Sequence, residues 1–199
     1  MTTILHIESS SHYEGSTTRE IGEFLINQLQ ESHHESRIIE RDLVKQPVPH
    51  ITPQMVAALG QPDSQELVLS NQLIDELFSA DIVVIEAPMY NFSIPSVLKA
   101  WIDHVTRAGR TFTYAGGAPK GLVTGKKAIL ILGRGGVYSE GPAKVMDYQE
   151  PYLRTILDFI GITDVQTIYI EGLGMGPEKV AEALHLARQT IATIIAKAA

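Results

Sequence analysis

Short apolar runs alternate with longer amphipathic stretches along this chain. The apolar runs predict five strands, at residues 3–8, 36–42, 81–86, 127–132 and 165–171. Between them, apolar residues recur with helical spacing and predict helices at residues 17–30, 64–80, 97–105, 148–159 and 177–197. Strands separated by helices of this length indicate right-handed β-α-β units, which build a parallel sheet with helices on both faces. We therefore predict an α/β fold.

Two segments depart from this alternation. Residues 47–62 are rich in proline and predict an irregular excursion, whereas residues 110–117 carry turn glycines and predict an inserted hairpin or loop. The five main strands suit the flavodoxin-like order 2-1-3-4-5, by analogy with other doubly wound parallel sheets. With 199 residues, 44% of them hydrophobic, the chain has enough apolar material for one buried core, so we predict one domain over residues 1–199.

Composition narrows the classes of function. The formal net charge is −7 and no basic stripe is visible, which argues against binding to nucleic acid or to anionic membranes. No apolar run is long enough to span a membrane, and the N-terminus lacks the basic-then-apolar order of a signal peptide, so we expect a cytoplasmic protein. The sequence contains no cysteine, which excludes disulfides, thiol nucleophiles and thiolate metal sites. Redox chemistry in this chain would therefore need a cofactor.

A hydroxyl-rich loop at residues 9–15 follows the first predicted strand and opens onto a helix. Free N–H groups at a helix start carry about half a positive charge and bind anions. Nearby hydroxyl groups add donors, so Ser10, Ser16, Thr17 and Thr18 are candidate phosphate ligands. The loop lacks the lysine of a nucleoside-triphosphate P-loop and the three spaced glycines of a dinucleotide fingerprint, so a monophosphate fits best. An ordinary loop with Ser16 as the helix N-cap is the alternative.

Residues 87–95 follow the third predicted strand and contain aromatic and amide side chains. In an open parallel sheet, ligands bind outside the carboxyl ends of the strands, so side chains at a strand exit face the ligand crevice. An amide that both donates and accepts, between two aromatic planes, suits a flat heterocycle with several ring nitrogens and carbonyls. A flavin matches that description, and Tyr90, Asn91 and Phe92 are the candidate contacts.

Glycines follow the fourth predicted strand, at Gly133, Gly135 and Gly136 around Arg134. Successive glycines let backbone N–H groups approach a ligand closely, and such donors would stabilise negative charge near N1 and O2 of a reduced flavin. A plain glycine turn with a solvated Arg134 is the alternative. Because the same edge of one sheet would hold all three strand exits, their conjunction indicates a ligand site.

Motifs along nearly the whole chain resemble the FMN-dependent NADH-azoreductases, which are related to the NAD(P)H:quinone oxidoreductases and share the flavodoxin-like fold. The resemblance rests on residues 88–95, 108–109, 111–112, 121–128, 134–136 and 159–164. It implies phosphate contacts from Ser10 and residues 16–18, and isoalloxazine contacts from Met89 to Phe92 and from residues 133–136. It also implies an active site at a homodimer interface, where Tyr114 and Phe159 would reach substrate bound against the other subunit's flavin.

The same resemblance implies a function. NADH or NADPH would give hydride to N5 of bound FMN, and a quinone or azo compound would then take two electrons in a ping-pong cycle. No side chain is implied as an obligatory acid or base. Two positions depart from the family pattern: Gly133 stands where serine is often found, which leaves only backbone donors there, and Tyr138 stands where some members carry histidine.

Other classes of protein are alternatives. A flavodoxin-like electron carrier or regulatory flavin-binding module would use the same phosphate loop but pass single electrons to a protein partner, which an acidic surface suits. A hydrolase with Ser9 or Ser10 as nucleophile lacks the Gly-x-Ser-x-Gly turn and an evident histidine partner. The adjacent His33 and His34 would point apart on a helix, so we expect surface residues there and no metal site.

Overall fold

The computed structural model describes residues 1–61 and 63–198, with a five-stranded parallel sheet at its centre. The strands of this sheet are β1 (Thr2–Glu8), β2 (Ser36–Asp42), β3 (Ile82–Pro88), β6 (Lys127–Gly133) and β7 (Asp164–Ile170). Their order is β2-β1-β3-β6-β7, and every neighbouring pair is parallel. The arrangement confirms the predicted order 2-1-3-4-5, and it brings the carboxyl ends of β1, β3 and β6 to one edge.

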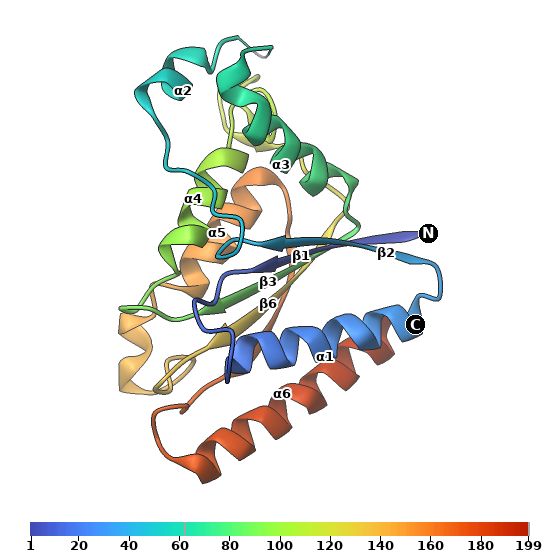
Figure 1. The fold of residues 1–199 in the computed structure, drawn as a ribbon, viewed down its shortest axis with the longest axis vertical. Helices are drawn as coiled ribbons and strands as arrows, with labels where there is room; N and C mark the ends of the chain where they lie inside the picture. Colours follow the sequence, from blue (N-terminus) through green and yellow to red (C-terminus); the bar gives the residue numbers. More distant parts are fainter. Residues whose placement is uncertain (62, 199) are drawn as a thin grey trace.

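Helices cover both faces of the sheet (Figure 1). One face carries α1 (Thr17–Ser32) and α6 (Pro177–Ala198), and the other carries α3 (Val68–Ser79), α4 (Ser96–Val105) and α5 (Glu150–Ile160). Side chains alternate along each strand, so Ile4 and Val84 pack toward α1 and α6 while Leu5 and Val83 pack on the opposite face. Both faces are apolar because helices bury both, which explains the nearly continuous apolar runs of the sequence.

The segment at residues 47–61 contains a short helix, α2 (Pro53–Ala58), so the expectation of an irregular excursion is wrong for residues 53–58, and residue 62 lies outside the described residues. Thr52 caps this helix, because its hydroxyl accepts a hydrogen bond from the Met55 N–H group at 3.1 Å. Pro53 occupies the first turn, where a missing N–H group costs little. Both signals are present in the sequence, but six residues are too few to show a helical period.

The inserted segment at residues 110–117 contains one strand of a small hairpin, as predicted. β4 (Phe112–Thr113) pairs antiparallel with β5 (Lys120–Gly121), which lies beyond the predicted segment. Two 3₁₀ turns, Gln65–Leu67 and Pro142–Met146, precede α3 and α5. None of the helices in the described part of the chain is both long and apolar enough to cross a membrane.

Candidate functional site

The exits of β1, β3 and β6 meet at a cavity of about 200 Å³ at the carboxyl edge of the sheet. Most of the predicted cofactor residues line this cavity: Ser10, Ser16, Thr17, Thr18, Met89, Tyr90, Gly133, Arg134 and Gly135. Asn91, Phe92 and Gly136 are outside its lining. The structure thus brings together the three segments that the sequence singles out.

The hydroxyl groups of the loop after β1 converge at the start of α1. Ser16 Oγ donates a hydrogen bond to Ser10 Oγ at 2.9 Å and lies 3.2 Å from Thr18 Oγ1. Ser16 is also the N-cap of α1, because its hydroxyl accepts from the Arg19 N–H group at 3.5 Å. Hydroxyl donors at the positive end of a helix dipole make a binding site for an anion such as phosphate. The N-cap and the candidate anion site therefore share Ser16.

A two-residue turn at Asn91 and Phe92 follows β3. Tyr90 and Ser93 exchange main-chain hydrogen bonds of 2.9 and 3.1 Å, and φ is 49° at Asn91 and 70° at Phe92. Two positive φ angles define a type I′ turn, in which asparagine is common but phenylalanine costs of order 1–2 kcal/mol. The turn leaves Phe92 44% exposed, edge-on to Tyr138 with ring centroids 6.2 Å apart. Strained backbone of this kind is typical of functional sites.

Tyr90 connects the hydroxyl-rich loop after β1 to a second cavity. Its hydroxyl accepts a hydrogen bond from the Ser11 N–H group at 3.2 Å, and the residue lines both cavities. The second cavity, of about 740 Å³, also contains Asn91 and lies beside the first turns of α4 and α5, with Lys99 and Tyr148 in its lining. A ligand with its phosphate near Ser10 could therefore extend its ring system past Tyr90 toward Asn91.

The side chain of Arg134 is fully buried and is bound by residues of other segments. Its Nε donates to Gln149 Oε1 and its Nη1 to Glu171 Oε1, both at 3.0 Å, and its Nη2 lies 2.9 Å from Asp147 Oδ2 in an ion pair that lacks hydrogen-bond alignment. Burial alone would raise the pKa of Glu171, but hydrogen bonds from Ser139 and Arg134 lower it overall. The solvated Arg134 of the alternative interpretation is therefore wrong, and Arg134 can contribute to the cavity through its main chain.

Two glycines at the exit of β6, Gly133 and Gly136, leave room for neighbouring side chains. A Cβ atom at Gly133 would lie 2.7 Å from Cγ2 of Thr18, a residue that is 1% exposed. A serine at this position would therefore collide with Thr18, which explains the glycine. A Cβ atom at Gly136 would lie 3.2 Å from the ring of Tyr138, so that ring covers Gly136.

The predicted substrate residues Tyr114 and Phe159 lie near each other but line neither cavity. Phe112 contacts both, with ring centroids 5.5 Å from Tyr114 and 4.5 Å from Phe159. Tyr114 follows β4 and is 60% exposed. Their proposed contact with substrate on another subunit stays a prediction.

The exit of β7 also contributes to the first cavity, which the sequence analysis missed. Leu173 lines it, and the Leu173 N–H group donates to the Arg134 carbonyl oxygen at 3.1 Å. Glycines at positions 172 and 174 flank Leu173, so a glycine-rich strand exit was the available signal. His12, Gly15 and Pro88 are further lining residues that the sequence analysis did not single out.

A buried charged pair lies beneath the site, between β1, β3 and α1. His6 Nε2 lies 2.5 Å from Glu86 Oε1. Burial alone would lower the pKa of His6, but the hydrogen bond and charge of Glu86 raise it overall. Burial raises the pKa of Glu86, so the two groups titrate as a coupled pair. Gly22 makes room for this pair, because a Cβ atom there would lie 1.6 Å from Glu86 Oε1.

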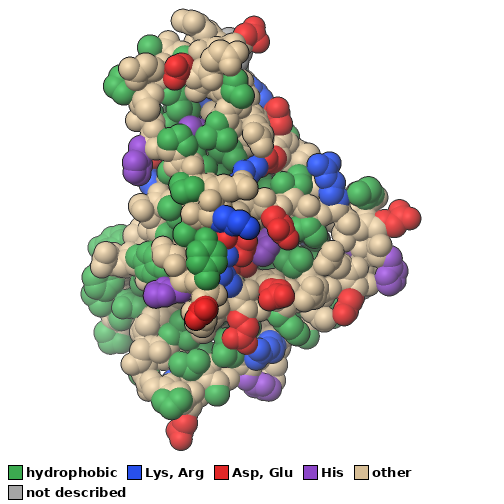
Figure 2. Space-filling model, in the orientation of Figure 1, with side chains coloured by type: hydrophobic (Ala, Val, Ile, Leu, Met, Phe, Trp, Pro, Cys, Tyr) green, Lys and Arg blue, Asp and Glu red, His purple; other side chains and the backbone are tan. Residues whose placement is uncertain are grey.

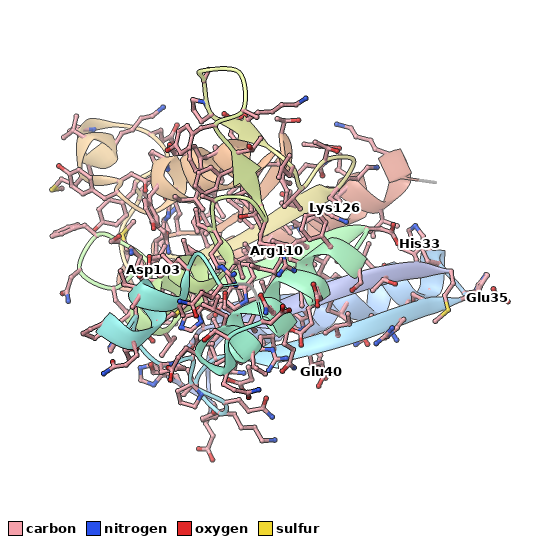
Figure 3. The ribbon with its side chains drawn as sticks, turned by 90° about the horizontal axis from the view of Figure 1, so that it is seen from above. His33, Glu35, Glu40, Asp103, Arg110 and Lys126 are labelled. Carbon is pink, nitrogen blue, oxygen red and sulfur yellow. The ribbon has the colours of Figure 1, made fainter. Side chains whose placement is uncertain are left out.

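Within the described residues, His6, Glu8 and Glu86 have potential metal-ligand atoms within 4.8 Å of one another. The sequence predicted no metal site, and its pattern gave no signal for this group. Each member already has a protein partner, since His6 and Glu86 contact each other and Glu8 pairs with Arg19 at 2.5 Å. We therefore interpret these three residues as structural support for the loop after β1. His33 lies elsewhere, near Glu35 at the C-terminal end of α1 (Figure 3).

A parallel five-stranded sheet with a cavity at the exits of β1, β3 and β6 defines a flavodoxin-like protein. A family model described as "Flavodoxin-like fold" matches residues 2–195. Proteins from Francisella philomiragia and Herminiimonas arsenicoxydans, each called FMN-dependent NADH:quinone oxidoreductase, are 48% identical to this chain over 96% of it and 97% of each relative. A crystal structure of an azoreductase from Bacillus anthracis has a TM-score of 0.91 at 29% identity, covering 99% of this chain and all of the other.

The chain therefore belongs to the flavodoxin-like family and, within it, to the family of the FMN-dependent NADH:quinone oxidoreductases. The resemblance to azoreductases and quinone oxidoreductases that the motifs indicate is confirmed.

Proposed function

We propose that this protein is an FMN-dependent oxidoreductase that transfers hydride from NADH, or NADPH, to quinones and azo compounds. One observation carries the proposal: the hydroxyl cluster, the aromatic turn and the glycine loop meet at one edge of the sheet. The names of the relatives supply FMN, NADH and quinone as the reactants to test. The azoreductase structure adds azo compounds as acceptors.

The residues at this edge fit both ends of FMN. Ser10, Ser16 and Thr18 offer converging hydroxyl groups at a helix start for the phosphate. Tyr90 and Asn91 offer an aromatic surface and an amide for the ring system in the adjoining cavity. When bound there, FMN would supply the redox chemistry, because its N5 accepts hydride and the reduced ring passes two electrons on.

The protein's own part is to bind, orient and stabilise charge. Gly135 lines the first cavity, and a Cβ atom there would meet nothing within 4 Å, so a flavin could approach its main chain closely. Its N–H group would then be a donor for the N1 and O2 side of the ring. The rings of Phe92 and Tyr138 pair edge-on beside the turn that carries Asn91, and in the loaded protein they would limit the access of water to the reacting atoms. We assign no side chain as an obligatory acid or base, and solvent would supply protons to the product.

We further propose that two copies of the chain complete the active site. Tyr114 and Tyr148 are 60% and 64% exposed, and exposed aromatic side chains are enriched at protein interfaces. In a homodimer, Tyr114 and Phe159 of one subunit would contact substrate against the flavin of the other. The cytoplasmic location and the single domain stay predictions.

Absorption spectroscopy with anaerobic reduction tests this function. We expect a flavin spectrum that NADH bleaches in one two-electron step and that a quinone, or separately an azo dye, restores. Initial rates at varied NADH and quinone concentrations should give parallel double-reciprocal lines, as a ping-pong cycle requires. A protein that cannot be loaded with FMN would refute the proposal.

The same titration distinguishes the enzyme from an electron carrier. A carrier would be reduced in two separate one-electron steps and would not respond to NADH or NADPH. The net charge of −7 suits a carrier that docks on a basic protein. The cavity of about 740 Å³ beside Tyr90 favours the enzyme, because it offers space for a nicotinamide or an acceptor next to the flavin.

A further inference from the structure

The loop with the phosphate ligands is held from behind by Arg19, in the first turn of α1. Arg19 Nη2 donates a hydrogen bond to the Ser10 carbonyl oxygen at 2.9 Å. Its Nη1 lies 2.5 Å from Glu8 Oε1 and 3.1 Å from Asp42 Oδ2, at the ends of β1 and β2. The guanidinium also lies over the ring of Tyr13, 4.6 Å from its centroid. Three elements and the loop therefore meet at one side chain.

Arg19 has no uncompensated charge to offer a phosphate. One guanidinium against the carboxylates of Glu8 and Asp42 leaves this group with a net charge of about −1. Burial raises the pKa of Asp42, but hydrogen bonds from Arg19 and from the Lys45 N–H group lower it overall, so it is ionised at neutral pH. Figure 2 shows acidic and basic side chains gathered on the face near the ends of β1 and β2. Ser10 lines the cavity, whereas Arg19 does not.

The peptide group between Ser10 and Ser11 is fixed on both sides. Arg19 binds its carbonyl oxygen, and the Tyr90 hydroxyl accepts a hydrogen bond from its N–H group. The C=O and N–H groups of a planar trans peptide point in opposite directions, so the two contacts together set its orientation. If this peptide turned over, its carbonyl oxygen would face the cavity and repel a phosphate bound beside Ser10.

We propose that Arg19 is a positioning residue, which raises the affinity for the phosphate of FMN without touching it. The inference rests on the proposed function. Ordering a loop during binding costs free energy, so a loop that is already fixed binds its ligand more tightly. Because Arg19 acts on the phosphate loop, its effect is specific to flavins that carry a phosphate. Riboflavin, with the same ring system and no phosphate, gains nothing from it.

Titration of the apoprotein with FMN and with riboflavin, followed by flavin fluorescence, tests this role. In Arg19→Gln, we expect the dissociation constant for FMN to rise about tenfold or more and that for riboflavin to change less than about threefold. Arg188→Gln is the matched control, because Arg188 also pairs with a carboxylate of α1, Glu20, at 2.5 Å and lies over Phe24, but does not contact the loop. Both constants should keep their wild-type values in this control.

A second variant separates charge from positioning. Arg19→Gln leaves Glu8 and Asp42 uncompensated, and that added negative charge would itself weaken phosphate binding. Arg19→Gln/Asp42→Asn leaves Glu8 alone and so restores the original net charge, but the contact with Ser10 is still missing. We expect its preference for FMN over riboflavin to stay low. Arg19→Lys, which keeps the charge with fewer donors, should recover part of the preference.

Three results would overturn the proposal. An equal loss of affinity for both flavins in Arg19→Gln would indicate general damage to the fold, and a full return of the FMN preference in the double variant would indicate charge alone. The third result concerns Asp42→Asn, which serves if Arg19→Gln does not fold. Loosening Arg19 should lower the preference for FMN over riboflavin in this variant, whereas an effect of charge alone would raise it. An unchanged or raised preference would therefore overturn the proposal. Wild-type protein that binds neither flavin would refute the proposed function, and the inference with it.

Discussion

Alanine at position 22 should destabilise this protein, although alanine usually stabilises a helix by about 1 kcal/mol relative to glycine. Gly22 lies inside α1 and packs against the buried Glu86. A Cβ atom there would lie 1.6 Å from Glu86 Oε1 and 2.4 Å from its Cδ, distances at which the atoms overlap. The carboxylate or the helix must therefore move, and Oε1 is the atom that contacts His6.

The cost of Gly22→Ala depends on which of them moves. If Glu86 rotates away, the buried pair with His6 breaks at a cost of about 3–5 kcal/mol. If α1 shifts outward instead, strained packing costs about 1–3 kcal/mol, and an overlap this deep belongs at the upper end of that range. The helix preference of alanine offsets about 1 kcal/mol of either cost. We therefore expect the free energy of unfolding to fall by about 2 kcal/mol or more, which lowers Tm by about 5 °C or more.

Urea denaturation of the apoprotein, followed by circular dichroism, measures this change. Glu86→Ala completes a double-mutant cycle, because it removes the carboxylate that the new methyl group would meet. In that background, Gly22→Ala should be neutral or stabilising by up to about 1 kcal/mol. The reasoning is refuted if Gly22→Ala leaves the stability of the otherwise wild-type protein unchanged, or if it causes the same loss in both backgrounds.

Three more predictions concern the residues that support the site. Gly133→Ser should lower the free energy of unfolding by about 1–3 kcal/mol in urea, because its Cβ atom would lie 2.7 Å from Thr18 Cγ2, and Thr18→Ser in the same protein should recover most of the loss. Phe92→Gly should raise the Tm of the apoprotein by relieving a positive φ worth about 1 kcal/mol, yet lower kcat by admitting water to the reacting atoms; an unchanged kcat would contradict that role of the ring. Raising the pH from about 6 to about 8 should lower the free energy of unfolding, because the folded protein, with raised pKa values at His6 and Glu86, keeps a proton that the unfolded chain releases. This contribution to the free energy of unfolding is complete below the pKa values of the unfolded chain and is lost as the pH rises through the pKa values of the folded protein. The free energy of unfolding of His6→Gln/Glu86→Gln should therefore depend less on pH.

The positions of the strands and helices follow closely from the hydrophobic pattern. β2 has its predicted bounds, and the ends of most other elements lie within about two residues of the prediction, as different assignment criteria themselves do. The agreement has a physical reason, since a sheet covered on both faces needs continuous apolar strands. The order of the strands came from analogy with doubly wound sheets, and the structure confirms it.

Contacts between distant segments could not be predicted in the same way. Arg134 stands among glycines at a strand exit. From these neighbours alone, its side chain was predicted either to contact a ligand or to be solvated. Its partners Gln149 and Glu171 come from two later segments, 15 and 37 residues away, and bury it completely. The positive φ of Phe92 is set by the bonds between the residues on either side of the turn, against the preference of phenylalanine itself.

The support of the site consists largely of matched positions on different elements. Gly22 on α1 leaves room for Glu86 on β3, and Gly133 on β6 leaves room for Thr18 on α1. In each pair, the absence of one side chain makes the other possible, so neither residue is explained by its own neighbours in the sequence. Hydrophobic periodicity indicates only whether each position is buried or exposed. That is enough to place the strands whose exits line the cavity. It does not predict which glycine faces which side chain. These pairings position α1, whose first residues carry the hydroxyl groups that we propose as phosphate ligands.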